Sequence, residues 1–490
     1  MKRTNRIYVI GAGFAGASIA AEVRRKGILG DVVAFLDDDR RKIGTRIDGV
    51  PVLGPIDDVI DLLNRNPADE ALIAMPNVSR ERLRQIYLLL VRAGFTRVRI
   101  LPSVAQLVDG EAHLIQTREI NPEDLLGRNP IRMNLRQSLA YLRGRRVAIT
   151  GAGGSIGGEL ARQLLSGGAA RLYLFDHCEN SLCDIERELK LLQEEGVGER
   201  ATVVPIVGEL QDADYTRFIL ARLRADVVFH AAAHKHVPMM ETNPVEAIKN
   251  NVFGTEHLVT AAREAGVKRF VMISTDKVVE PRSVYGASKR IAEQIVLSRN
   301  GSDSAFMVVR FGNVLGSNGS IIPLFREQIR RGGPLTLTDT ETTRYFMTIS
   351  EAAALVLQAG GVGTAGELYI LDMGEPVRIR DLAEQMIRFY GFEPEQDIRI
   401  DVVGLRPGEK QHERLHECDE QLEASGHPRL NRVCGHHELI EDLPGLLDRL
   451  RPICYYSADQ PALYRSRHAM RSLLTAHVPT LDIPVNEPEY

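Results

Sequence analysis

The sequence predicts an α/β protein with two Rossmann-like units, each built on a doubly wound parallel sheet. A strand, a glycine turn and an amphipathic helix begin at "RIYVIGAGFAGASIAAEVRRKG", and the same design returns at "RRVAITGAGGSIGGELARQLLSGG". Each copy continues into a second apolar strand that ends in acid, "VVAFLDDD" and "RLYLFD". Strand, helix and strand in this order form the repeating unit of doubly wound folds. A chain of 490 residues has room for both units and a further region.

Four segments are expected along the chain. Residues 1–117 form an N-terminal accessory unit, and 118–143 form a polar linker that contains two prolines and has no strong period. Residues 144–433 form the second unit, which ends in a small substrate-binding region. Strand signals fade after about 416, and 434–490 are predicted to be a helical extension with a loose tail.

Composition excludes several classes of protein. A net charge of −4 argues against nucleic acid as the main partner. Five scattered cysteines predict a reducing cytosol rather than a disulfide framework, and no run reaches the ~18 apolar residues of a membrane span. Cys434, His436 and His437 lack a second pair with zinc-like spacing, so no metal site is expected.

In the first glycine turn, Gly11, Gly13 and Gly16 fit G-x-G-x-x-G, and Asp37 ends the next strand. Such glycines let the backbone close around a pyrophosphate at a helix N-terminus, where unpaired N–H groups favour anions. The acid suits a ribose hydroxyl. No catalytic group follows this copy, so a tight turn without a ligand explains it as well as a nucleotide site does.

In the second turn, Gly151, Gly154 and Gly157 have the wider G-x-x-G-x-x-G spacing, and Asp176 ends the next strand. Ligand binding is predicted here because residues suited to redox chemistry lie downstream. An acid at Asp176 accepts hydrogen bonds from a ribose 2′-hydroxyl and repels a 2′-phosphate, which favours NAD over NADP.

Tyr285 and Lys289 form a Tyr-x-x-x-Lys pair after the buried strand "RFVMI". A free tyrosine has a pKa of about 10, and a neighbouring ammonium together with the positive ring of the cofactor stabilises the phenolate. Tyr285 then takes a hydroxyl proton while a hydride leaves the same carbon. Alone, the pair equally fits the start of a surface helix; after a dinucleotide turn it indicates a short-chain dehydrogenase site.

Asp276 and Lys277 follow the same strand directly, at the carboxyl end where ligands bind in such sheets. An acid and a base side by side suit an elimination, in which one removes a proton beside a ketone and the other protonates the departing hydroxyl. A solvated ion pair is the alternative.

Seven segments together resemble the CapD-like nucleotide-sugar 4,6-dehydratases of bacterial polysaccharide biosynthesis, which are extended short-chain dehydrogenases: "TGAGGSIGGEL", "HAAAHKHVPMME", "STDKVVEP", "YGASKR", "RFGNVLGSNGSIIPLF", "TRYFMTISEA" and "GLRPGEK". The resemblance runs from about 118 to 433, and the first unit resembles the accessory domain of the larger members. It implies UDP-N-acetylglucosamine as substrate, a UDP-4-keto-6-deoxy sugar as product, and NAD as the bound cofactor.

The resemblance also implies residue roles. The dinucleotide would lie on Gly151, Gly154, Ser155, Ile156, Gly157, Asp176, Glu209, Ala231, Ala232, Tyr285 and Lys289. The catalytic positions would be Thr275, Asp276, Lys277, Tyr285 and Lys289. The nucleotide sugar would be held by Lys235, Asn313, Arg344, Arg406 and Glu409, because arginines suit a diphosphate and a carboxylate suits ribose hydroxyls. A surface ion pair is the alternative for each arginine.

The sequence departs from the family at three points. Larger members often have methionine at the place of Tyr285, and the tyrosine is usual in smaller members that invert carbon 5, so retention and inversion both stay open. Glu209 replaces an aspartate expected near the adenine. Larger relatives have membrane helices before the first unit, so the chain is either a shortened form or a naturally soluble one. It is expected in the cytoplasm, at the inner face of the membrane if such helices precede it.

Two other functions stay open. A nucleotide-sugar 4-epimerase needs Tyr285 but has no evident use for Lys277. A non-catalytic nucleotide-sugar sensor has no evident use for a complete set of catalytic positions. A homo-oligomer is expected in each case.

Overall fold

The computed structural model describes residues 5–27, 29–95, 97–101, 118–120, 139–299, 304–364, 366–434 and 440–482. The chain divides into two compact units, Met1–Leu135 with Leu192–Val197, and Arg136–Leu191 with Gly198–Tyr490. Most of the predicted linker, 121–138, lies outside the described residues, as do His436 and His437. Within the described residues, no helix is both long and apolar enough to span a membrane, and no three His, Cys, Asp or Glu side chains are grouped to hold a metal.

The first unit is a seven-stranded sheet in the order β3-β4-β2-β1-β5-β6-β7, parallel except for the β3–β4 and β6–β7 pairs. Its core gathers the buried faces of β1, β2, β5 and α1, with Phe35 at 0 % exposure. The elements are β1 (Arg6–Ile10), α1 (Phe14–Lys26), β2 (Asp31–Leu36), β3 (Arg46–Ile47), β4 (Val50–Gly54), α2 (Val59–Arg65), β5 (Glu70–Ile73), α3 (Arg80–Ala93), β6 (Arg97–Ile100) and β7 (Arg118–Glu119).

The second unit is a nine-stranded sheet in the order β10-β9-β8-β11-β12-β13-β18-β22-β21. The first seven strands run parallel, and β22 and β21 are added antiparallel. The strands are β8 (Arg146–Thr150), β9 (Arg171–Asp176), β10 (Thr202–Val207), β11 (Val227–His230), β12 (Arg269–Ile273), β13 (Ala305–Arg310), β18 (Leu368–Leu371), β21 (Gln421–Ala424) and β22 (Leu430–Cys434). The predicted α/β fold with two Rossmann-like units is confirmed.

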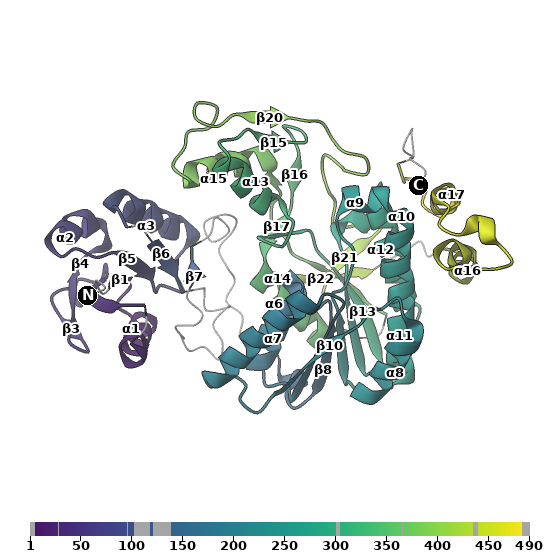
Figure 1. Cartoon of the computed structure of the whole chain (residues 1–490), viewed down its shortest axis with the longest axis horizontal. Coiled ribbons are helices and arrows are strands. Elements are labelled where there is room, and N and C mark those ends of the chain that lie inside the picture. Colours follow the sequence, from purple (N-terminus) through teal and green to yellow (C-terminus); the bar gives the residue numbers. More distant parts are fainter. Residues whose placement is uncertain are drawn as a thin grey trace. The chain divides into compact units, whose positions relative to one another are not determined.

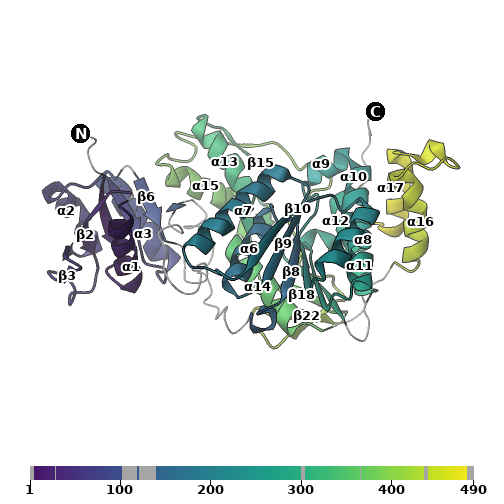
Figure 2. The ribbon, with the colours of Figure 1, turned by 60° about the horizontal axis from the view of Figure 1, so that its bottom comes forward.

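Helices cover both faces of this sheet (Figures 1 and 2). One layer contains α6 (Ser155–Ser166), α7 (Glu179–Glu194) and α14 (Ile349–Val362), and the other contains α8 (Ala213–Leu223), α10 (Pro244–Ile248), α11 (Gly254–Glu264) and α12 (Val284–Leu297). The inner strands, from β9 through β18 in the sheet order, are almost completely buried, as expected for a parallel sheet covered on both sides.

A smaller region lies beyond the carboxyl ends of the strands, drawn in green at the top of Figure 1. Three two-stranded ladders and two helices build it. They are β14 (Asn313–Leu315) with β17 (Phe346–Thr348), β15 (Leu335–Leu337) with β20 (Ile400–Val402), β16 (Thr343–Arg344) with β19 (Val377–Arg378), and the helices α13 (Ile321–Arg330) and α15 (Ile379–Phe389).

The last two described helices, α16 (Leu443–Cys454) and α17 (Arg467–His477), pack on the helical layer that contains α10 and α12 (Figure 2). Apolar side chains of α16 and α17 join the main core. Arg471 of α17 donates to buried Glu241 of α9 (Val237–Thr242) at 3.1 Å, and the other carboxylate oxygen of Glu241 accepts from Val284 N at 2.7 Å. The C-terminal helices therefore brace the start of α12.

Two strands form after residue 416, where the strand signals of the sequence fade. β21 and β22 follow that point and extend the sheet beyond β18. The four residues of β21 are all exposed, so this edge strand lacks the apolar alternation by which strands are predicted. It forms because β22 offers a paired partner, which local sequence does not show.

Candidate active site

The second glycine turn joins β8 to α6 and has a backbone that only glycine permits. Gly151 has a φ of +69°, and a Cβ there would lie 2.6 Å from the backbone nitrogen of Ala232. A Cβ on Gly157 would lie 2.1 Å from the carbonyl oxygen of Gly151. Ala231 and Ala232, at the end of β11, thus border the turn. Gly154 is the N-cap of α6, so the helix N-terminus opens onto this turn.

Ser155 and Ile156 form the first turn of α6. The Ser155 hydroxyl accepts a hydrogen bond from the backbone of Asn318 at 3.1 Å, which ties the segment after β14 to the helix N-terminus. The helix N-terminus and its unpaired N–H groups are suited to an anionic group.

Asp176 ends β9 and braces the glycine turn. Its carboxylate accepts from Gly153 N and from Cys178 N, both at 2.9 Å, and the residue is 7 % exposed. Gly208 follows the neighbouring strand β10, and its backbone N–H donates to the backbone carbonyl of Asp176. Glu209 is the next residue and is exposed. A narrow glycine turn, an open helix N-terminus and a carboxylate beside them fit a dinucleotide with free ribose hydroxyls.

The segment that directly follows β12 buries a carboxylate. Asp276 is 0 % exposed, and its Oδ1 accepts from the Thr275 hydroxyl at 3.0 Å and from Lys277 Nζ at 2.9 Å. Its Oδ2 accepts no hydrogen bond from the described residues. A Cβ on Gly312 would lie 3.0 Å from that oxygen, so the glycine leaves room for it. Phe311 O accepts from Asp276 N at 3.1 Å and fixes the backbone.

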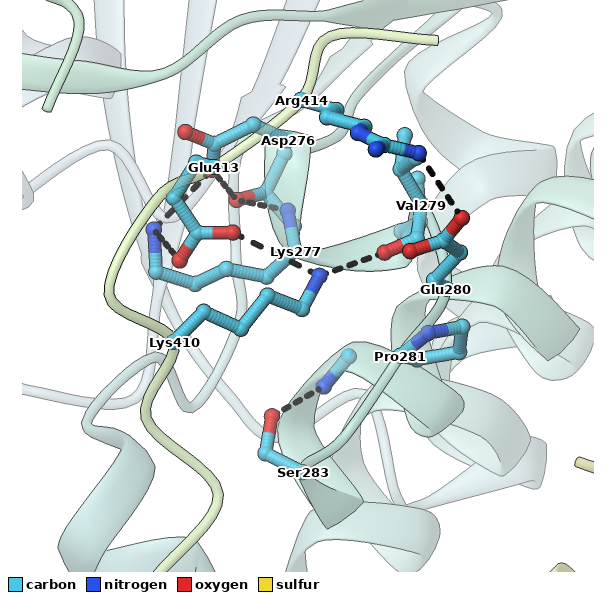
Figure 3. A network of polar contacts seen from close by, with 12 residues as sticks. Asp276, Lys277, Val279, Glu280, Pro281, Ser283, Lys410, Glu413 and Arg414 are labelled. Atoms are coloured by element: carbon cyan, nitrogen blue, oxygen red, sulfur yellow. Dashed lines mark hydrogen bonds and ion pairs between the residues drawn. The ribbon is translucent and has the colours of Figure 1, made fainter. Parts of the chain in front are cut away.

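Lys277 lies between two acids and an amide (Figure 3). Besides Asp276, its Nζ donates to Asn313 Oδ1 at 3.2 Å and lies 3.7 Å from Glu413 Oε1. Burial lowers the pKa of Lys277, but the charges of Asp276 and Glu413 outweigh burial and raise it overall. The side chain is therefore an ammonium at neutral pH.

Tyr285 and Lys289 are presented by α12, whose N-cap Ser283 accepts from Gly286 N at 3.1 Å. A Cβ on Gly286 would lie 2.3 Å from Lys277 O, so glycine lets the helix approach the Asp276–Lys277 segment. Both side chains are buried.

The pKa values of this pair differ from the expectation. Burial raises the pKa of Tyr285 to about 12; Lys277 and a hydrogen bond with Thr275 oppose this. Among the groups that lower the phenol pKa, Lys277 is the cation that acts on it here, and the lowering by Lys289 stays a prediction. Burial lowers the pKa of Lys289 itself to about 8, against the charge of Glu293.

Of the predicted substrate residues, Asn313 joins the Lys277 cluster. Arg344 donates to backbone carbonyls of Thr343, Lys410 and Gln411 at 2.7, 2.6 and 3.0 Å. It thereby holds the 410–411 segment in place. Glu409 is half-buried, and Arg406 and Lys235 are exposed.

A family model described as a polysaccharide biosynthesis protein matches residues 147–434, which include all of these side chains. The chain belongs to this family. The predicted resemblance to its CapD-like nucleotide-sugar dehydratases is confirmed. A second model, described as a CoA-binding domain, matches residues 1–102 in the first unit.

Relatives of this polysaccharide biosynthesis family match either most of the chain or somewhat more than half of it. The chain is 42 % identical over 411 residues to the capsular polysaccharide biosynthesis protein CapD of Staphylococcus aureus, covering 83 % of this chain and 68 % of that protein. It is 31 % identical over 283 residues to the UDP-N-acetylglucosamine 4,6-dehydratase (inverting) of Campylobacter jejuni, covering 56 % and 79 %. The crystal structure of Pen from Bacillus thuringiensis is similar at a TM-score of 0.53 and 32 % identity, over 61 % of this chain and 88 % of that one.

The structure adds residues to the site that sequence analysis missed. Glu413 and Lys410 reach Lys277 and Val279 from the segment after "GLRPG". Buried Asn251 accepts a hydrogen bond from His234 N at 2.8 Å and donates one to His234 O at 3.0 Å. It also donates to the Ser288 hydroxyl of α12 at 3.0 Å. Asn251 lies in a π-helical turn, Lys249–Phe253, a feature frequent at functional sites but without a reliable sequence signal.

Proposed function

We propose that the chain catalyses 4,6-dehydration of UDP-N-acetylglucosamine to a UDP-4-keto-6-deoxy sugar for bacterial surface polysaccharide, by internal oxidation, water loss and reduction. The observation that supports it best is the convergence of Asp276, Lys277 and Tyr285 at the carboxyl end of β12, in the same unit as the glycine turn. The Campylobacter jejuni relative carries this activity in its name.

The glycine turn and Asp176 would hold a nicotinamide dinucleotide, which supplies acceptance of a hydride from carbon 4 and its return to carbon 6. Asp176 keeps lone pairs for ribose hydroxyls beyond its two backbone hydrogen bonds, and its charge repels a 2′-phosphate. We therefore expect NAD to bind more tightly than NADP.

Tyr285 would take the proton of the carbon 4 hydroxyl during the oxidation. With a pKa of about 12 the phenol is protonated at neutral pH, and its own proton has to leave first. Thr275, which is hydrogen-bonded to it, and the nearby Lys277 charge favour that loss.

Asp276 and Lys277 would carry out the elimination. At rest the proton is on Lys277, and the 2.9 Å hydrogen bond from Lys277 Nζ to Asp276 Oδ1 is the path along which it passes to Asp276 before the elimination. With the proton on Asp276, the neutral amine takes the carbon 5 proton, and Asp276 gives its proton to the carbon 6 hydroxyl, which departs as water. The Lys277 proton then returns to carbon 5, and the proton that left Tyr285 before the oxidation re-protonates the Asp276–Lys277 pair, so the sugar loses one water and no net oxidation occurs.

Mass spectrometry of the product from UDP-N-acetylglucosamine tests this function. Loss of one water is expected, whereas an unchanged mass with an altered carbon 4 configuration would establish the epimerase instead. That alternative has a specific basis, because the chain is 37 % identical over 203 residues to the UDP-glucose 4-epimerase of Rickettsia canadensis.

Two variants separate the steps. Lys277→Ala is expected to lower turnover by about 10²–10⁴-fold and leave the cofactor reduced, visible as nicotinamide absorbance. Tyr285→Phe keeps the ring packing and is expected to lose the oxidation at carbon 4, so the cofactor is not reduced and the nicotinamide absorbance does not appear. Normal turnover by Lys277→Ala would remove this lysine from the mechanism.

A further inference from the structure

Glu413 is a buried carboxylate placed between two ammonium groups (Figure 3). Its side chain is 3 % exposed, with Oε1 3.7 Å from Lys277 Nζ and Oε2 3.5 Å from Lys410 Nζ. Lys410 Nζ also donates to Val279 O at 2.5 Å, which fixes it against the segment that follows Lys277. An acid this deeply buried is retained in proteins only with charged partners.

The cluster is electrically balanced as it stands. Two carboxylates, Asp276 and Glu413, face two ammonium groups, Lys277 and Lys410. The other groups that face Lys277 are the amide of Asn313, the phenol of Tyr285 and, at longer range, the positive charge of Arg344. Removal of the Glu413 charge leaves Lys277 with Asp276 as its one acidic partner.

We infer that Glu413 is a positioning residue for the proposed dehydration: through its charge it stabilises the ammonium that forms when Lys277 takes the carbon 5 proton. This inference rests on the proposed function. In that step a positive charge develops on Nζ while Asp276 loses its proton to the departing hydroxyl. A fixed negative charge near Nζ favours the ammonium that this transfer forms over the neutral amine from which the transfer starts.

The geometry argues for this role over a purely structural one. The distance of 3.7 Å from Lys277 Nζ to Glu413 Oε1 exceeds a hydrogen bond, so Glu413 acts through charge, whereas Asp276 and Asn313 hold the amine directly. Glu413 Oε2 accepts no hydrogen bond from the described residues. A brace would be expected to have its oxygens hydrogen-bonded.

The segment that carries Glu413 is itself fixed to the catalytic helix. A Cβ on Gly408 would lie 2.8 Å from Ser283 Cβ, so this loop touches the N-cap of α12. Arg344 holds the carbonyls of Lys410 and Gln411. The carboxylate therefore has a defined place relative to Lys277, as a positioning role requires.

The test is Glu413→Gln, which keeps the shape and removes the charge. Acylation of Lys277 by acetic anhydride, followed across pH by mass spectrometry, reports the protonation of its amine without any turnover. The midpoint is expected to fall by about 1–3 pH units, the usual effect of losing one opposite charge within 4–6 Å. Glu341→Gln, an exposed acid paired with Arg378, is the matched control and is expected to leave the midpoint unchanged.

Single-turnover kinetics complete the test. The elimination rate is expected to decline at high pH, and this decline is its alkaline limb. In Glu413→Gln the alkaline limb is expected at lower pH, because the shared proton is lost earlier. The rate of cofactor reduction is expected to stay as in the wild type. An unchanged acylation midpoint and an unchanged limb would overturn the inference. If Glu413→Gln does not fold, Glu413→Asp carries the same test, with a smaller downward shift expected and no shift contradicting us.

Failure of this inference differs from failure of the function. Wild-type protein that removes no water from UDP-N-acetylglucosamine refutes the proposed dehydration, whatever the labelling shows. Wild-type protein that does so, with variants that keep both the limb and the midpoint, refutes only the role of Glu413.

Discussion

The glycine turn after β1 and the one after β8 have nearly the same backbone, although they lie in different units. Gly11 and Gly151 both have positive φ, +102° and +69°. A Cβ on Gly16 would lie 2.0 Å from Gly11 O, just as one on Gly157 would lie 2.1 Å from Gly151 O. The spacing of the glycines differs by one residue, and the closure of the turn is the same.

The acids that follow these turns are also alike. Asp37 accepts from Ala12 N at 2.7 Å and Asp39 N at 2.9 Å, which matches the way Asp176 accepts from its own turn and from the residue two positions on. Each acid therefore stabilises the turn by itself. A glycine fingerprint with its acid consequently predicts the fold well and a bound nucleotide poorly.

The difference between the units lies around the turn. In the first unit, α1 begins with Phe14, which is 76 % exposed. In the second unit, α6 begins with Ser155, whose hydroxyl is hydrogen-bonded to the segment after β14. Asp37 is paired with Lys42 at 2.9 Å. The strand β6 of the first unit corresponds in the sheet order to β12 of the second. In the sequence, β6 is followed by the mainly apolar "LPSVAQL", whereas β12 is followed by "STDKVV". Chemistry is thus specified by the strand ends beside the turn.

Substituting the closing glycines should have the largest effect. Gly157→Ala and Gly16→Ala each push a Cβ into a backbone carbonyl that has no rotamer to change, at a cost of about 1–3 kcal/mol or more. We expect Gly157→Ala to abolish measurable NAD binding by calorimetry and turnover with it. Gly16→Ala should destabilise the first unit and leave NAD binding and turnover unchanged.

Gly13→Ala is the control for the glycine pair, because a Cβ there meets nothing within 4 Å. It is expected to behave as wild type. Loss of turnover in Gly16→Ala with its unit folded would show that the first turn also serves the reaction.

The acids should give a smaller effect of the same form. Asp37→Ala and Asp176→Ala each leave two backbone N–H groups without an acceptor, and each unit should lose about 1–3 kcal/mol of stability. Only Asp176→Ala should weaken NAD binding. Hydrogen exchange resolved by unit measures the stability, and calorimetry measures the cofactor; weaker NAD binding in Asp37→Ala would contradict the division of roles.

The sequence was sufficient to predict the two sheets and both glycine turns, because these depend on local patterns. Alternating apolar runs, three glycines and an acid follow one another within about 30 residues. The place of Asp276 and Lys277 at the end of β12 was predicted for the same reason. Their mutual hydrogen bond then follows from adjacency.

Contacts between distant segments were not predictable. Glu413 lies more than 130 residues from Lys277 in the chain, and Arg471 lies 230 from Glu241. Nothing local to "KQHERLHE" distinguishes the buried acid from its exposed neighbours. Arg344 was assigned to the nucleotide sugar by the family resemblance, but its contacts with three carbonyls depend on where the 410–411 segment folds. Its role toward a diphosphate stays a prediction.

The two units also differ in the residues at one pair of positions, which lies directly before each glycine turn. In the second unit, Thr150 of β8 pairs with His230 of β11, and in the first unit the corresponding pair is Ile10 with Ile73. The Thr150 hydroxyl lies 2.7 Å from His230 Nδ1, and Thr255 Oγ1 lies 3.0 Å from Nε2. Because the Thr255 hydroxyl donates to Asn251 O, its oxygen accepts from Nε2–H, and Nδ1 accepts from Thr150.

This histidine should give the smallest effect, as a pH dependence found in one unit. Burial, and secondarily Lys289, lowers the pKa of His230 to about 3, whereas the unfolded value is about 6.5. Below pH 6.5 the unfolded state therefore binds the proton first. The stability that neutral His230 gives is complete above about 6.5 and is lost as the pH falls toward 3, by up to about 1.4 kcal/mol per pH unit. His230→Gln, compared with wild type in urea at pH 7 and pH 5, should flatten this slope in the second unit, while the first unit, with isoleucines at both positions, should unfold alike in both proteins. An equal slope in wild type and variant would show that His230 is charged in the folded protein, and would remove this contrast between the turns.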